Sequence, residues 1–244
     1  MRRLVIVLPF YHSDREACMR MARYVCALED KYRDDVELCF CNRWDTDPLH
    51  PGEMMRFVAT FKVSWFPSTT KAEGHPKGCN AMARDIFHEA LRRSNVGGPW
   101  EDVEALLFME PDCVPVAKDW IDQLRAAWDR KDDHALVVGC YRDRDVDVPH
   151  VNGNALWSPR LAAHINIDVD CHGFGWDSAL AEQIASRFCD TPLIANLFKE
   201  TNVPESRMRN NPFNSFGVPV LLHGVKDDSA TKYAEKCTGV RFPT

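Results

Sequence analysis

An apolar segment that ends in two acidic residues most constrains how this chain can fold. Residues 106–109 are all hydrophobic, as in a buried strand, and Glu110 and Asp112 follow with a single proline between them. Because side chains alternate along extended backbone, the two carboxylates are expected to emerge together at the strand's carboxyl end. Ligands bind at that end of the strands in open α/β sheets. The pair suits Mg²⁺ or Mn²⁺ shared with phosphate oxygens, although Pro-Asp after a strand is also ordinary turn chemistry.

Strand and helix patterns alternate along the chain. The apolar residues 3–9 predict a buried strand, and the amphipathic pattern that follows predicts a helix from Ser13 or Asp14 to about residue 31. Further helices are predicted near 53–63, 79–93, 117–130 and 178–189, and further strands near 36–41, 106–109, 135–140 and 218–222. This alternation predicts an α/β sandwich with a mostly parallel central sheet.

No shift in composition marks a linker, so we expect the 244 residues to form one domain. Residues 200–216 are rich in Asn, Pro, Ser and Gly without a helical or strand period, which predicts a mobile loop. No apolar run approaches the roughly 20 residues that a membrane-spanning helix needs. The first apolar run ends at Pro9 without a cleavage site, so it is interpreted as a strand and not as a signal peptide.

Net charge and cysteine spacing limit the expected binding partners and cellular location. The net charge of −6 gives no overall electrostatic footprint for nucleic acid or an anionic membrane. Residues 199–241 carry seven Lys/Arg against five Asp/Glu, so a local basic groove remains open. The ten cysteines include no C-x-x-C pair, which argues against a zinc ribbon or a redox motif and favours a reducing, cytoplasmic location.

Several motifs, taken in order, resemble glycosyltransferases of the GT-A fold, which use nucleotide-sugar donors. They are the strand end Pro9-Phe10-Tyr11, the polar cluster with Asp45, the helix start at 78–84, Glu110-Pro111-Asp112, the segment 150–155, the acidic motif at 172–177 and His223-Gly224-Val225-Lys226. The resemblance implies a single GT-A-like catalytic domain over residues 1–244, built as a three-layer sandwich. Glu110 stands where the family usually has Asp, and Asp177 precedes Ser178 where many members carry a second acid, so metal geometry and stereochemistry stay open.

The resemblance also implies a metal site. Asp112 would bind the ion directly, Glu110 directly or through water, and His223 would be a third ligand. An imidazole beside carboxylates suits Mn²⁺ better than Mg²⁺. Lys226 would then neutralise the leaving diphosphate.

A second set of residues is expected to bind the donor. Lys77 and Arg84 flank a helix start, where phosphate is attracted, although both also fit a solvated helix start. Asn80 is a candidate for a sugar or ribose hydroxyl. The remaining candidates lie where such enzymes hold the nucleoside: Pro9, Tyr11 and Asp45. Asp45 fits an ordinary turn equally well.

Acceptor and sugar recognition is assigned to His150, Asn152, Asn154 and Trp176. Amide side chains both donate to and accept from sugar hydroxyls, while Asn-Gly is also a strong hairpin signal. Trp176 would offer an apolar platform. Asp177 would act as the general base on the acceptor hydroxyl, or would orient the donor sugar in a retaining enzyme; as a helix N-cap it would have neither role.

Taken together, these features predict a metal-dependent glycosyltransferase that moves a sugar from a UDP- or GDP-sugar to an acceptor hydroxyl. A saccharide acceptor and a hydroxymethylated DNA base in a phage-infected bacterial cell both remain open, and the latter would need the basic groove. Two alternatives are a nucleotidyltransferase that makes nucleotide-sugars and a non-catalytic nucleotide- or carbohydrate-binding module. The turn after the first strand lacks the glycine typical of nucleotidyltransferases.

Overall fold

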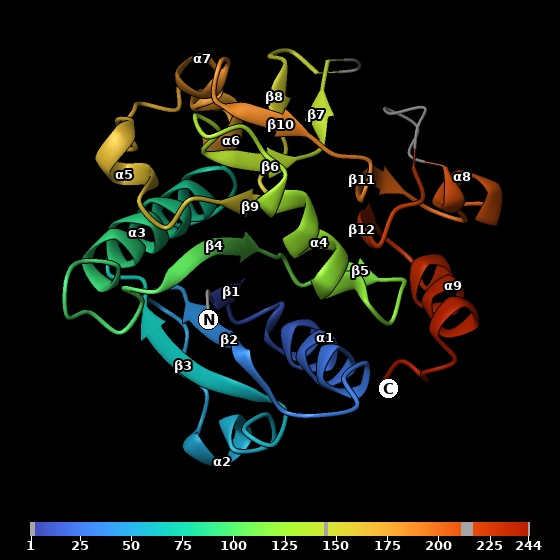
Figure 1. Ribbon diagram of the computed structural model, residues 1–244. Coiled ribbons are helices and arrows are strands. Elements are labelled where there is room, and N and C mark those ends of the chain that lie inside the picture. The colour runs from blue at the N-terminus through green and yellow to red at the C-terminus, as the bar shows by residue number, and fades with distance from the viewer. Residues whose placement is uncertain (1–2, 144–145, 211–216, 244) are drawn as a thin grey trace.

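The computed structural model describes residues 3–143, 146–210 and 217–243 (Figure 1). Its strands are β1 (Arg3–Phe10), β2 (Arg33–Asn42), β3 (Phe61–Pro67), β4 (Val103–Phe108), β5 (Val114–Pro115), β6 (Val137–Gly139), β7 (Tyr141–Arg142), β8 (His150–Val151), β9 (Leu156–Trp157), β10 (Phe188–Asp190), β11 (Ile194–Glu200) and β12 (Leu221–Val225). Its helices are α1 (Arg15–Ala27), α2 (Pro51–Met54), α3 (Lys77–Arg93), α4 (Trp120–Asp129), α5 (Leu161–His164), α6 (Trp176–Ala179), α7 (Ala181–Ile184), α8 (Glu205–Arg209) and α9 (Ser229–Thr238).

A seven-stranded sheet forms the centre, in the order β10-β6-β9-β4-β1-β2-β3. The pairs of β1 with β2, β1 with β4, β2 with β3 and β6 with β10 are parallel. The short strand β9 runs antiparallel to both of its neighbours. The predicted mixed α/β architecture with a mostly parallel central sheet is therefore confirmed.

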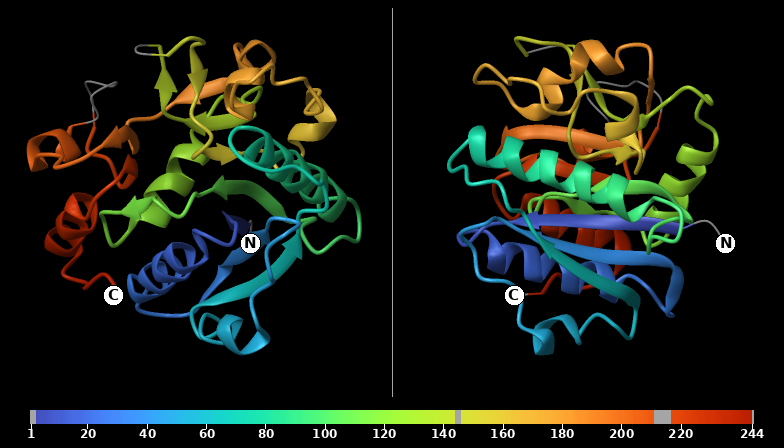
Figure 2. Two further views of the ribbon diagram at one scale, coloured as in Figure 1. Left: turned by 180° about the vertical axis from the view of Figure 1, so that it is seen from behind. Right: turned by 90° about the vertical axis from the view of Figure 1, so that its left-hand side faces the viewer.

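Strand alternation divides the interior into two cores, one on each face of the sheet. Along β1, Leu4, Ile6 and Leu8 join the core shared with α1, α4 and α9, whereas Val5 and Val7 join the core shared with α3, α5 and α7. All five side chains are almost fully buried, as expected for a central parallel strand covered on both faces. The layers of helix, sheet and helix can be followed in Figure 2.

A smaller, three-stranded sheet lies next to the carboxyl end of β4. It consists of β11, β12 and β5, with β11 and β12 parallel and β12 and β5 antiparallel. Strand β5 begins two residues after Asp112. This sheet therefore meets the chain immediately beyond the carboxyl end of β4.

Several predicted elements are corrected by the structure. The helix predicted near 53–63 is only the four-residue α2, which begins with Pro51 and a capping box between His50 and Glu53; β3 then starts at Phe61. This strand is an edge strand with half-exposed side chains, so it lacks the continuous apolar run of a buried strand. The helix predicted near 178–189 is two short helices, α6 and α7, followed by β10.

The predicted loop at 200–216 contains the short helix α8, and its residues 211–216 lie outside the described residues. The strand expected near 218–222 begins later, at Leu221. Within the described part of the chain, none of the helices has the length and hydropathy needed to traverse a bilayer. All ten cysteines are described, and all carry free thiols.

Candidate active site

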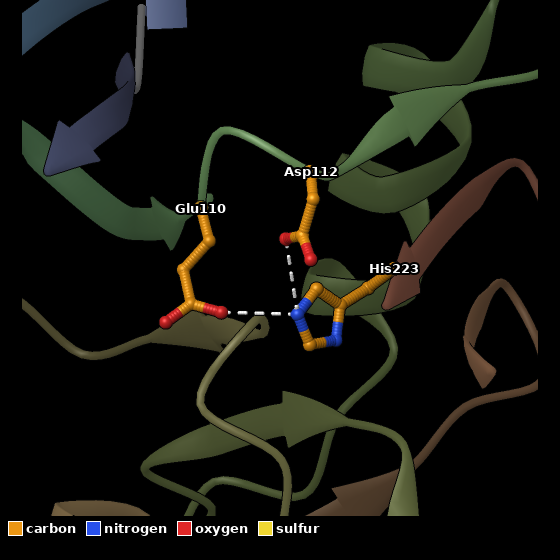
Figure 3. Close-up of side chains that lie close together, drawn as sticks. All are labelled: Glu110, Asp112 and His223. Atoms are coloured by element: carbon orange, nitrogen blue, oxygen red, sulfur yellow. Dashed lines mark hydrogen bonds and ion pairs between the residues drawn. The ribbon is translucent and has the colours of Figure 1, made fainter. Parts of the chain in front are cut away.

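Strand pairing brings together three side chains that could bind a metal ion. After β4, the amide of Cys113 donates to the carbonyl of Glu110 at 3.0 Å, which closes a tight turn around Asp112. The chain then enters β5, where Val114 pairs with Leu222 of the antiparallel strand β12. His223 follows Leu222 directly, so this register places its imidazole beside the turn (Figure 3).

The three side chains point toward one another in Figure 3. Nε2 of His223 lies 3.0 Å from Oε2 of Glu110 and 3.3 Å from Oδ1 of Asp112. The ligand atoms of all three residues lie within 4.8 Å of one another. Two carboxylates and one imidazole form a donor set that fits Mn²⁺ and leaves coordination positions for phosphate oxygens.

The charges of this cluster are strongly coupled. Burial lowers the pKa of His223, but hydrogen bonds with Asp112 and Glu110 and their negative charges outweigh it and raise the pKa to about 9. Burial opposes ionisation of Asp112, but His223 and then Lys226 hold its pKa well below the usual range. The pKa of Glu110 is lowered in the same way, by His223 and Asn154. The cluster is thus a set of ion pairs that a divalent cation would replace.

Two buried amides hold the candidate ligands in place. Oδ1 of Asn196 lies 3.2 Å from Nδ1 of His223, which orients the ring from the side away from the carboxylates. Asn154 accepts the backbone N–H of Glu110 at 2.8 Å and donates from Nδ2 to Oε2 of Glu110 at 3.0 Å. Asn154 thereby links the end of β4 to the β8–β9 connection.

A cavity of 430 Å³, called the donor cavity here after the predicted residues that line it, opens in front of the cluster. Of the residues predicted to bind the donor, Pro9, Tyr11 and Lys226 line it. Nζ of Lys226 lies 2.5 Å from Oδ2 of Asp112, so this cation is held directly at the candidate metal site. Asp14 also lines the cavity and accepts the amide of Tyr11 at 2.6 Å; burial raises its pKa to about 6.

The other predicted donor residues lie elsewhere. Asp45 forms a two-pronged ion pair with Arg43, at 2.6 and 2.7 Å, and the guanidinium of Arg43 lies 5.0 Å from the centre of the Tyr11 ring. Neither Asp45 nor Arg43 lines the donor cavity, so Asp45 is linked to it only indirectly, through Arg43 and the Tyr11 ring. Lys77, Asn80 and Arg84 line another cavity, of 460 Å³, whose lining includes neither Glu110 nor Asp112 nor His223.

A third cavity, of 450 Å³, adjoins the donor cavity and is called the acceptor cavity here after the predicted residues that line it. Its lining contains every predicted acceptor or sugar residue together with the predicted base: His150, Asn152, Asn154, Trp176 and Asp177. Asn80 lines it as well, and its Nδ2 donates to the carbonyl of Phe174 at 2.9 Å. The two cavities share several residues, namely His75, Cys79, Glu110, Trp176, Lys199 and His223.

Asp177 is held by backbone amides at the edge of the third cavity. Its Oδ2 accepts the N–H of Gly153 at 2.9 Å, and its Oδ1 accepts the N–H of Ser178 at the same distance. Nε2 of His150 lies 3.7 Å from Oδ2. Each carboxylate oxygen therefore keeps acceptor capacity beyond its backbone bond.

Two predicted sugar-binding side chains are largely engaged within the protein. Trp176 is 9% exposed and packs its ring against Phe87, Phe108 and Trp157 at centroid distances of 5.2 to 5.4 Å. Asn154 is 2% exposed and bonds to Glu110 through both ends of its amide. Direct contact of either with a sugar stays a prediction.

Some residues of the cavities have no signal in the sequence. Lys199 lies on β11, a strand that the sequence pattern does not reveal, and His75 belongs to no motif; Cys79 lies in the helix start at 78–84 but was given no role. The sequence pattern indicates Asp14 only as a possible first residue of a helix. Its place in the short turn between the carboxyl end of the buried strand β1 and α1 is the signal that could have identified it.

No family model and no curated protein sequence matches the chain. Solved structures do match. The galactosyltransferase LgtC in complex with donor and acceptor sugar analogs superposes with a TM-score of 0.59 at 10% identity, covering 97% of each chain. The chain has the GT-A glycosyltransferase fold.

Two further structures support the same fold. Mouse xyloside xylosyltransferase 1 matches with a TM-score of 0.55 at 10% identity, over 91% of this chain and 97% of that one. The glycosyltransferase GlyE of Streptococcus pneumoniae matches with a TM-score of 0.53 at 8% identity, over 96% of this chain and 60% of that one. At such identities the likeness is one of fold.

Proposed function

We propose that the protein is a metal-dependent glycosyltransferase that moves a sugar from a nucleoside diphosphate donor to an acceptor hydroxyl. The observation that carries this proposal is the cluster of Glu110, Asp112 and His223, joined by Lys226, at the floor of the donor cavity in a GT-A fold. Mn²⁺ or Mg²⁺ would be held by the first three residues and would bind the diphosphate, neutralising its growing charge.

The chain's own residues divide the remaining work between the two cavities. Lys226 places a positive charge beside the diphosphate, and Tyr11 and Pro9 border the space for the nucleoside. In an inverting reaction, the acceptor oxygen forms a bond to the anomeric carbon while the bond between that carbon and the phosphate oxygen breaks. The electron pair of the broken bond stays on the phosphate oxygen. Asp177 takes the acceptor proton. In a retaining reaction, Asp177 orients the donor sugar.

The charges around the acceptor cavity favour a neutral saccharide. Among the described residues, its lining holds three carboxylates and two permanent cations: Glu110, Asp147, Asp177, Arg142 and Lys199. A polyanion such as DNA binds through an excess of cations. The hydroxymethylated DNA base is therefore the second choice of acceptor.

The experiment that tests the proposal measures transfer from a panel of UDP- and GDP-sugars to oligosaccharides, with and without Mn²⁺. We expect metal-dependent transfer from one donor and a loss of roughly a hundredfold or more in Asp112→Asn, because an amide cannot replace the metal-binding charge. The matched control is Asp34→Asn, an exposed aspartate of β2 remote from the cavities. Wild-type turnover in Asp112→Asn would refute the proposal, and pyrophosphate release from a nucleoside triphosphate and a sugar phosphate would favour a nucleotidyltransferase.

A further inference from the structure

Lys199 adopts a backbone conformation that lysine rarely takes. Its φ is +57°, in the left-handed region, where a β-carbon crowds the backbone and glycine or asparagine is preferred. Only two other described non-glycine residues have positive φ, His172 and Asn202. Strained residues of this kind persist where the surrounding structure imposes them, and they cluster at functional sites.

An irregularity in β11 imposes this conformation. Asn196 pairs with His223 and Glu200 pairs with Val225, so four steps along β11 correspond to two along β12. The extra residues form a bulge, and bulges redirect side chains. Both of its ends are fixed, by the Asn196–His223 hydrogen bond of 3.2 Å and by a 2.9 Å bond from the amide of Lys226 to the carbonyl of Glu200.

The bulge places Lys199 at the boundary of the donor and acceptor cavities. Lys199 lines both of them, together with Glu110 and His223, whereas Lys226 lines the donor cavity alone. If the donor diphosphate lies on the metal cluster and the acceptor lies beside Asp177, the bond between sugar and phosphate falls at this boundary. A cation there faces the oxygen that leaves the sugar.

We propose that Lys199 contacts the phosphate of the donor that carries the sugar, and stabilises the charge that this phosphate gains as the sugar leaves. This inference rests on the proposed glycosyl transfer. The carbon–oxygen bond breaks with its electron pair on the phosphate oxygen, and the Lys199 ammonium donates a hydrogen bond to that oxygen without giving up its proton. Lys226, directly after β12, and Lys199, on β11, then provide two cations, one at the metal and one at the breaking bond.

The left-handed backbone at residue 199 makes it possible to test the charge of the lysine without disturbing the fold. Lys199→Asn removes the cation with a residue that tolerates this conformation, and Lys199→Arg keeps the cation. We expect Lys199→Asn to melt at or above the wild-type temperature while kcat falls roughly tenfold to a hundredfold and the acceptor KM stays unchanged. Lys199→Arg restores most of kcat. The control Lys118→Asn, at an exposed lysine that lines none of the described cavities, keeps wild-type kcat.

The outcomes separate this inference from the proposed function. If the wild type neither binds any nucleotide-sugar donor nor transfers sugar from one, the proposed function fails. If the wild type is active and Lys199→Asn keeps kcat within about twofold, or loses only acceptor KM, the role of Lys199 at the leaving phosphate is wrong. A lowered melting temperature in both Lys199→Asn and Lys199→Gly would show that the lysine serves the fold, and would also overturn the inference.

Discussion

At the scale of single residues, the protonation state of His223 controls the candidate metal site. A metal ion must displace the proton on the Nε2 atom of this imidazole, which faces Glu110 and Asp112. Two carboxylates raise its pKa to about 9, so without a metal the ring is protonated near neutral pH. Only the neutral imidazole binds a metal. The same contacts therefore stabilise the metal-free fold and oppose metal binding.

The sign of the resulting pH dependence follows from this raised pKa. Stability that His223 gains from its ion pairs is fully present below its unfolded pKa of about 6.5 and is lost as pH rises through about 9. We therefore expect the increase in melting temperature caused by Mn²⁺ to grow between about pH 6.5 and about pH 8.5. Thermal unfolding with Mn²⁺ or a chelator measures it. An increase that is the same at every pH would contradict this prediction.

Cys79 offers a test of the donor cavity that does not depend on activity. It and Cys237 are the two exposed cysteines, and only Cys79 lines the donor and acceptor cavities. We expect a thiol reagent to modify both residues first, and the correct nucleoside diphosphate with Mn²⁺ to slow modification of Cys79 alone. Peptide mass spectrometry gives both rates, with Cys237 as the internal control. Equal protection of both would point to a global effect of the ligand instead.

At the scale of elements, the β8–β9 connection packs closely against α6 at Gly153. Gly153 donates its amide to Asp177, and a β-carbon at Gly153 would lie 2.8 Å from Cζ2 of Trp176. That ring packs against the rings of Phe87, Phe108 and Trp157, which restrict its movement away from residue 153. The position of the candidate base thus depends on the absence of a side chain at residue 153.

Gly153→Ala is expected to displace α6 and to destabilise the protein by about 1–3 kcal/mol, because the extra methyl group overpacks a rigid contact. Catalysis should fall further than stability explains, because Asp177 moves with the helix. Denaturant unfolding and transfer rates measure the two effects. Gly52→Ala, whose β-carbon would lie no closer than 3.3 Å to any neighbouring atom (Nδ1 of His50), is the matched control. Unchanged stability in Gly153→Ala would show that the connection adapts.

Elements also determine how much of the site the sequence could predict. Glu110 and Asp112 follow a strongly apolar strand, so local pattern placed them at a carboxyl end. His223 could be assigned only through the family resemblance, because the pairing of β12 with β5 joins residues more than a hundred positions apart. Lys199 had no signal at all, since a bulge in β11 is a property of its pairing with β12.

At the scale of the whole molecule, charge bears on the acceptor. The net charge of −6 and the mixed charges of the acceptor cavity favour a neutral saccharide. We expect the acceptor KM to change little between about 50 and 200 mM salt, whereas a DNA acceptor would lose affinity by orders of magnitude over that range. Transfer assays at both salt concentrations distinguish the two. A steep salt dependence would favour the DNA base.

The measurement that tests the metal–donor site most directly is calorimetric titration of UDP and GDP into the protein, with and without Mn²⁺. We predict that one nucleotide binds only when Mn²⁺ is present, and that Asp112→Asn abolishes this binding. The variant should still unfold cooperatively in the presence of a chelator, at a melting temperature below that of the wild type because its ion pairs with His223 and Lys226 are lost. Binding that is indifferent to the metal and to the substitution, or no binding of either nucleotide, would contradict the assignment of Glu110, Asp112 and His223 as the metal ligands that hold a nucleoside diphosphate.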